Sequence, residues 1–198
     1  MKSRSVLPEN YALLLSIDLQ KNKKLMFIIN ALAVVIAFVM ALPMHFFVPI
    51  SSLFSMEQGF GPYLVRFGVL AVGFIAYIVL HEAVHGVAMR MCGTKKISFG
   101  LKGPYAFAGS NDYYYKKPYI FIALAPVVFW GAVLLVINCF VSAEWFWVVY
   151  LIQIGNISGA AGDFYVSARF SKLPADILVR DSGVAMEVFS PSNEKDGA

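Results

Sequence analysis

The chain has 198 residues, of which 59% are hydrophobic and 14% charged, and its formal net charge is +4. This composition is far too apolar for an ordinary soluble domain and leaves no room for a second large domain. The positive charges flank apolar runs instead of forming one basic patch, which argues against a nucleic-acid partner. We therefore expect a single membrane-embedded domain over residues 1–198, with the lipid bilayer as a partner.

Four apolar segments are long enough to cross a bilayer as helices. They run from about 25 to 47, 63 to 89, 118 to 141 and 145 to 165. The last of them is the most polar, because it contains Gln153, Asn156 and Asp163. The predicted fold class is a membrane all-α protein with four transmembrane helices.

Short polar segments beside these spans alternate apolar and polar residues with the period of a β-strand. The alternation covers 13–20, 97–102 and 184–188, and Gly103-Pro104 turns the chain into 105–108. Together these segments predict a small cytoplasmic β-sheet. The run from Tyr113 to Tyr115, beside two lysines, is instead typical of an aromatic belt at a membrane interface.

The distribution of Lys and Arg predicts the orientation of the spans. If the N-terminus is cytoplasmic, every Lys and Arg except Arg66 lies on the cytoplasmic side. We therefore expect a multi-pass protein of the cell membrane whose N- and C-termini are both cytoplasmic.

The second span carries three ionisable residues in one helical turn, His81, Glu82 and His85, after fourteen uncharged residues from Phe67 to Leu80. Two imidazoles four residues apart lie on one face of a helix and can bind one zinc ion. The neighbouring Glu82 can then deprotonate a water, as in the zinc-peptidase motif H-E-x-x-H. Ionisable groups at membrane depth are costly, which favours this interpretation over a soluble core helix with satisfied histidines.

A catalytic zinc usually has three protein ligands, so the motif needs one more. Measured along ideal helices, His81 and His85 lie roughly 13 and 7 Å inward from Arg90, and Asp163 roughly 9 Å inward from Arg169. The matching depth makes Asp163 the predicted third ligand. The alternative is that Asp163 only caps the end of a helix.

Asn156 precedes Asp163 on the same predicted span, and an amide inside a membrane requires a hydrogen-bonding partner. Asn156 is therefore a candidate for substrate binding or for orienting a metal ligand. Simple hydrogen bonding between helices is the alternative.

Further segments accompany the motif in a fixed order along nearly the whole chain: Leu7-Pro8-Glu9-Asn10-Tyr11, Ile17-Asp18-Leu19 to Lys24, Ala125-Pro126 and Gly159-x-x-Gly162-Asp163. With this pattern the chain resembles a family of bacterial zincin membrane peptidases that looks related to the site-2 proteases. In site-2 proteases, a later motif N-x-x-P-x-x-x-x-D-G supplies the third zinc ligand. This chain has Asn156-x-x-Gly159-x-x-x-Asp163-Phe164, with Gly for Pro, the Asp one residue earlier and no following Gly.

The sequence thus predicts a zinc metalloendopeptidase in which His81, His85 and Asp163 bind Zn²⁺ and Glu82 is the general base. The resemblance implies that a membrane protein or peptide is cut in or beside the membrane, near the cytoplasmic face. An exposed sheet edge at 105–108 would hold the unwound substrate as an added strand. The alternative function is a non-catalytic zinc-binding membrane scaffold or a transporter subunit. Glu82 argues against it, because a structural zinc needs no carboxylate beside its ligand.

Overall fold

The structure, a computed structural model, describes residues 2–18, 21–102, 105–183 and 185–192. The chain packs into two compact units. One, called here the sheet unit, consists of Met1–Phe27, Glu82–Ala125 and Asp163–Ala198. The other, the helical unit, consists of Ile28–His81 and Pro126–Gly162.

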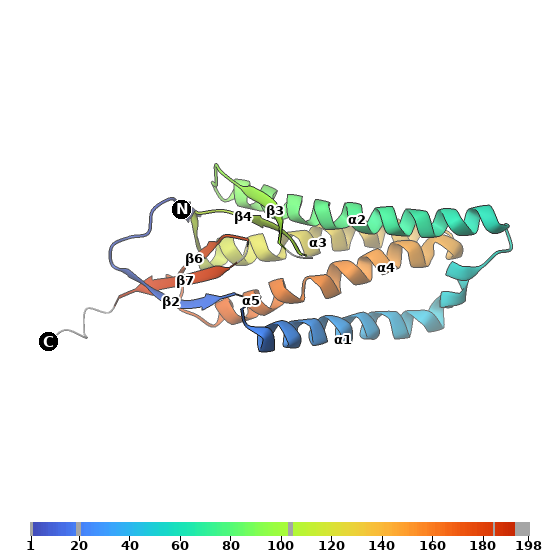
Figure 1. The fold of residues 1–198 in the computed structure, drawn as a ribbon, viewed down its shortest axis with the longest axis horizontal. Coiled ribbons are helices and arrows are strands. Elements are labelled where there is room, and N and C mark those ends of the chain that lie inside the picture. Colours follow the sequence, from blue (N-terminus) through green and yellow to red (C-terminus); the bar gives the residue numbers. More distant parts are fainter. Residues whose placement is uncertain (1, 19–20, 103–104, 184, 193–198) are drawn as a thin grey trace. The chain divides into compact units, whose positions relative to one another are not determined.

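In its described part, the sheet unit contains two small antiparallel sheets (Figure 1). The larger has the strand order β1-β5-β6-β7-β2, formed by Ser3–Arg4, Tyr113–Tyr115, Leu178–Asp181, Met186–Pro191 and Tyr11–Ile17 respectively. The smaller is a hairpin of β3 (Ser98–Lys102) and β4 (Tyr105–Gly109). A sheet is therefore confirmed, although the predicted strands are divided between two. The predicted Gly103-Pro104 turn lies outside the described residues.

Three strands of the larger sheet were not predicted from alternation. β1 has only two residues, and β6 begins with two fully buried ones, so neither has a period of two. β5 is the tyrosine run assigned above to a membrane interface, yet Tyr114 is completely buried. The Tyr114 hydroxyl lies 2.6 Å from Thr94 Oγ1 and 2.7 Å from Ser110 Oγ, which explains why a polar ring tip tolerates this burial.

The core of the sheet unit joins the strands to three helix segments. These belong to α2 (Phe60–Met91), α3 (Lys116–Phe140) and α5 (Ala161–Ser171). Met89 of α2, Tyr119 of α3 and Phe170 of α5 are each at most 2% exposed and belong to one apolar cluster with the sheet. Burial of large side chains stabilises by about 1.5–3 kcal/mol each, so this cluster fixes the helix segments that carry His85 and Asp163.

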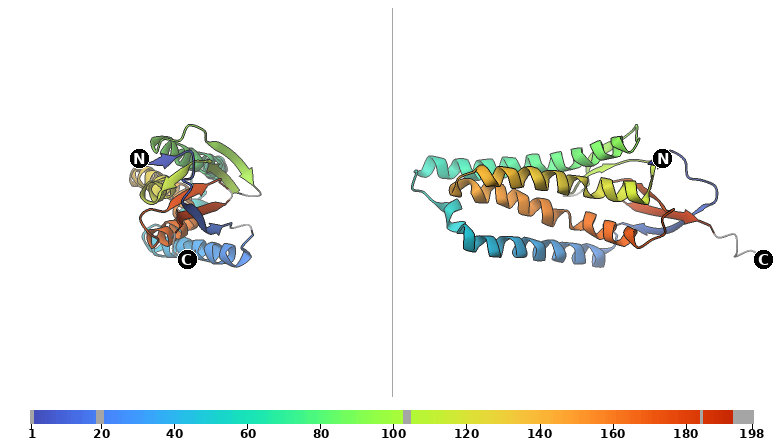
Figure 2. Two further views of the ribbon diagram at one scale, coloured as in Figure 1. Left: turned by 90° about the vertical axis from the view of Figure 1, so that its left-hand side faces the viewer. Right: turned by 180° about the vertical axis from the view of Figure 1, so that it is seen from behind.

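The helical unit contains the remaining lengths of α2 and α3, most of α1 (Lys23–Phe47), the short 3-10 helix η1 (Ile50–Phe54) and α4 (Ala143–Gly159) (Figure 2). Trp147 is completely buried in its core and donates a hydrogen bond from Nε1 to the Val48 carbonyl at 2.9 Å. Arg66 is 2% exposed and forms an ion pair with Glu144 at 3.7 Å. Elsewhere the helices expose large apolar side chains, such as Val72 at 69%.

Among the residues that the structure describes, three helices are long and apolar enough to cross a membrane by length and composition: α1 with 25 residues, α2 with 32 and α3 with 25. They coincide with the first three predicted spans. The fourth predicted span, 145–165, is not confirmed, because α4 ends at Gly159 and α5 begins at Ala161. Glycine is a poor helix former, and Asp163 favours the first turn of a new helix, so the chain breaks here.

Candidate metal centre

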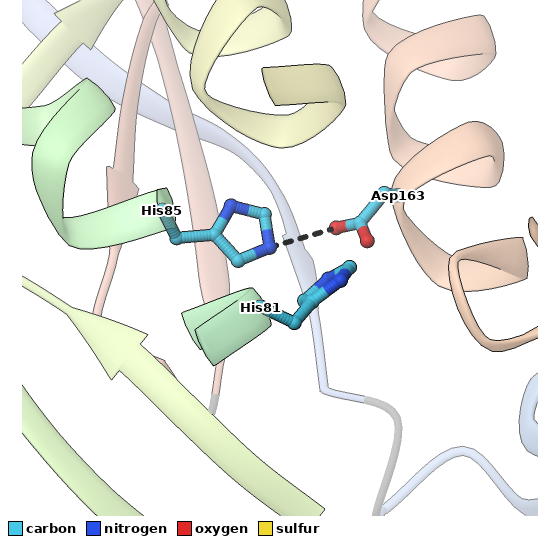
Figure 3. A group of neighbouring side chains, drawn as sticks. All are labelled: His81, His85 and Asp163. Carbon is cyan, nitrogen blue, oxygen red and sulfur yellow. Dashed lines mark ion pairs between the residues drawn. The ribbon is translucent and has the colours of Figure 1, made fainter. Parts of the chain in front are cut away.

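The structure brings three predicted ligands together. His81 and His85 lie one turn apart on α2, and Asp163 lies in the first turn of α5 (Figure 3). One ligand atom of each residue lies within 4.8 Å of those of the other two. His85 Nε2 lies 3.9 Å from Asp163 Oδ1. Two imidazole nitrogens and a carboxylate oxygen are a donor set that zinc prefers, so these residues fit the ion.

His85 is oriented by the backbone of α3. Its Nδ1 lies 2.9 Å from the carbonyl oxygen of Ile122, which can only accept, so Nδ1 carries the proton and donates it. Nε2 is then the nitrogen that can coordinate a metal. A ligand histidine that donates its other N–H to a carbonyl is the usual arrangement in zinc sites.

His81 is oriented by a residue that sequence reasoning missed. Its Nδ1 lies 2.8 Å from the hydroxyl of Tyr77, which precedes it by one helical turn. The spacing Tyr77-x-x-x-His81-x-x-x-His85 was a usable signal, because residues four apart share a helix face.

Asn156 contacts neighbouring helices. It is completely buried, its Nδ2 donates to the Val127 carbonyl at 3.1 Å, and its Oδ1 accepts from the Tyr77 hydroxyl at 3.1 Å. Its predicted role in substrate binding stays a prediction.

Glu82 lies partly buried on α2 and accepts a hydrogen bond from the backbone amide of Ala108 on β4. This contact places the carboxylate beside β4, whose described pairing is with β3. The predicted general base and the predicted substrate-binding segment therefore meet in the structure.

Asp181 is a second residue that the sequence did not associate with the site. At the end of β6, it accepts hydrogen bonds from the Tyr119 hydroxyl and the Gly183 amide, both at 2.8 Å. Burial raises the pKa of the Asp181 carboxyl above its usual range, and these two hydrogen bonds oppose the increase. Asp181 lies close enough to Asp163 and Glu82 for the negative charges of the carboxylates to repel one another. No sequence pattern links β6 to the motif, so only the fold shows this proximity.

Known proteins are similar to the part of the chain that contains the site. The sequence profile of a family described as "Putative zincin peptidase" matches residues 74–178. The chain is also 28% identical over 123 residues to an uncharacterised 24.7 kDa protein of Pyrococcus woesei. That match covers 60% of this chain and 53% of the relative, so the chain spans about half the relative's length. No solved structure matches the chain.

Proposed function

We propose that the chain, which belongs to the family described as "Putative zincin peptidase" by its match over residues 74–178, more than half of its length, is a membrane zinc metalloendopeptidase. The observation that carries the proposal is the group His81, His85 and Asp163, with ligand atoms within 4.8 Å of one another. Glu82, adjacent to one of these histidines in the sequence, completes a peptidase site.

In the proposed mechanism, His81, His85 and Asp163 would hold Zn²⁺. Glu82 acts first as the general base and then as the general acid. Bound zinc would supply Lewis acidity, which lowers the pKa of a water toward about 7 and polarises the scissile carbonyl. The Glu82 carboxylate accepts a proton from the attacking water and later gives it to the leaving amine nitrogen. The Ala108 amide keeps the carboxylate in place through both transfers.

We propose that the substrate is a membrane protein or peptide that binds as an extended strand along β4. In a helical substrate the carbonyls are already hydrogen-bonded, so the segment to be cut must unwind first. Within the described residues, β4 pairs only with β3, and its Ala108 amide points to Glu82. A strand added at this edge would lie beside the general base.

The sheet supports a membrane topology in which both termini are on one side. β2 precedes α1, β7 follows α5, and these two strands pair with each other. Strands of one sheet share a side, so the chain crosses an even number of times between them. If α1, α2 and α3 each cross the membrane once, α4 and α5 must provide a fourth crossing. The 17 residues of α4 span roughly 25 Å, near the lower limit for crossing.

The positive residues at both ends support a cytoplasmic location for that side. The proposed cut is therefore made near the cytoplasmic face.

The test compares membrane proteomes of cells that express wild-type protein, Glu82→Gln or Glu57→Gln. Glu57 is an exposed carboxylate in the loop before α2, and its substitution is the matched control. We expect peptides that appear with wild-type protein and Glu57→Gln but not with Glu82→Gln, because removing a general base costs at least about 100-fold in rate. Identical peptide patterns for all three zinc-loaded proteins would favour the non-catalytic scaffold instead.

A further inference from the structure

A chain of buried hydrogen bonds in the helical unit ends at His81. Its first member is Asn156 on α4, which is completely buried. Asn156 Nδ2 lies 3.1 Å from the Val127 carbonyl of α3, and only a nitrogen can donate to that oxygen. This contact fixes which way the amide faces, so it is Oδ1 that lies toward Tyr77.

The orientation of Asn156 determines where the proton of the Tyr77 hydroxyl lies. Asn156 Oδ1 can only accept, so the hydroxyl donates its one proton across the 3.1 Å contact. Toward His81 Nδ1, at 2.8 Å, the same oxygen must then accept. His81 therefore carries its proton on Nδ1, and the lone pair available to a metal is on Nε2.

We propose that Tyr77 is a positioning residue that holds His81 in the Nδ1-protonated form, and that Asn156 acts through Tyr77. The inference rests on the proposed function, because it names how one zinc ligand is prepared. The Tyr77 hydroxyl oxygen accepts the proton of His81 Nδ1, just as the Ile122 carbonyl accepts that of His85 Nδ1. Both histidines then present Nε2, and neither ring has to change its proton position when zinc binds.

This arrangement differs from an ordinary contact between helices. A purely structural bond would stabilise the fold without affecting the metal. Tyr77 is 8% exposed, so its hydroxyl has little access to water that could replace Asn156 and restore the bond. The orientation of His81 thus depends on residues from α2, α3 and α4.

The first test measures zinc affinity of the full chain in detergent, by competition with a chelator. Tyr77→Phe removes only the hydroxyl, and we expect affinity to fall by about 10- to 100-fold, the usual effect of losing a partner behind a ligand histidine. Tyr150→Phe is the matched control, since its hydroxyl donates to the Met40 carbonyl at 3.1 Å in the same unit. Equal affinities for the two variants would overturn the proposal.

A second measurement reads the proton position on the ring and depends on neither zinc nor proteolysis. The chain has three histidines, so ¹⁵N-histidine labelling gives a simple long-range ¹H–¹⁵N spectrum. We expect His81 as the Nδ1–H form in metal-free wild-type protein and as a mixture in Tyr77→Phe. An unchanged His81 pattern in Tyr77→Phe would contradict the proposal, even if the protein proved to be no peptidase.

A double-mutant cycle tests whether Asn156 affects zinc binding through Tyr77. Asn156→Leu should weaken zinc binding in wild-type protein but have little further effect in Tyr77→Phe, because Asn156 acts through the hydroxyl. Fully additive losses would show that Asn156 acts independently and would refute the order of the chain.

Discussion

Replacing Asp163 by Asn separates the two interpretations of this residue. Asp163 lies in the first turn of α5 and also 3.9 Å from His85 Nε2. As a helix-terminal charge it stabilises the fold by about 0.3–1 kcal/mol. Asn keeps the shape and loses only this charge, so the melting temperature should fall by at most about 4 °C.

The substitution should lower zinc affinity much more than it lowers stability if Asp163 is a zinc ligand. Loss of a hydrogen-bond partner of a metal ligand lowers metal affinity by about 10- to 100-fold. Loss of the ligand itself should therefore lower zinc affinity by more than about 100-fold, or about 2.8 kcal/mol. A neutral amide is a poor substitute for a carboxylate at zinc. Zinc affinity and proteolysis should therefore fall together in Asp163→Asn.

The assay is chelator competition on detergent-purified protein, with melting measured on the same samples. Asp176→Asn changes an exposed carboxylate and is the control. Asp163→His should recover part of the zinc affinity, because three histidines also form a catalytic zinc site. Wild-type affinity in Asp163→Asn would refute the ligand assignment and leave Asp163 as a helix-terminal residue.

Two further predictions concern topology and the sheet unit. A cysteine at the exposed Gln58, in a chain with Cys92 and Cys139 replaced, should react with an impermeant reagent only from outside the cell, and labelling only from the cytoplasm would overturn the topology. Tyr114→Phe should lower the melting temperature by about 4–8 °C, because loss of the buried hydroxyl takes a partner from Thr94 and Ser110 and costs about 2 kcal/mol. An unchanged melting curve would mean that these contacts are not formed.

Sequence spacing was sufficient to predict the arrangement of residues within one helix. His81 and His85 share a face because a helix repeats every 3.6 residues, and the surrounding apolar run identifies the helix. Matching depth then selected Asp163, and the structure places it with the two histidines. That Asp163 binds zinc stays a prediction, and the break at Ala160 between α4 and α5 was not predicted.

Sequence patterns did not predict the contacts that depend on tertiary packing. Nothing local indicates that Asn156 would meet Tyr77, because the contact joins residues 79 positions apart. Asp181 lies outside the predicted spans, and only the pairing of β6 with β5 and β7 brings it close to Glu82. Alternation also fails for strands that are very short or fully buried, which is why β1, β5 and β6 were missed.

Metal analysis of the purified full chain tests directly whether His81 and His85 hold zinc. We expect about one zinc per wild-type chain, most of which is lost in His81→Ala or His85→Ala. His45→Ala should keep it, because His45 lies near the end of α1 and its Nδ1 accepts a hydrogen bond from the Ile50 amide at 3.2 Å. Full zinc content in the His81 and His85 variants, or loss of zinc in the His45 variant, would contradict a zinc site at His81 and His85.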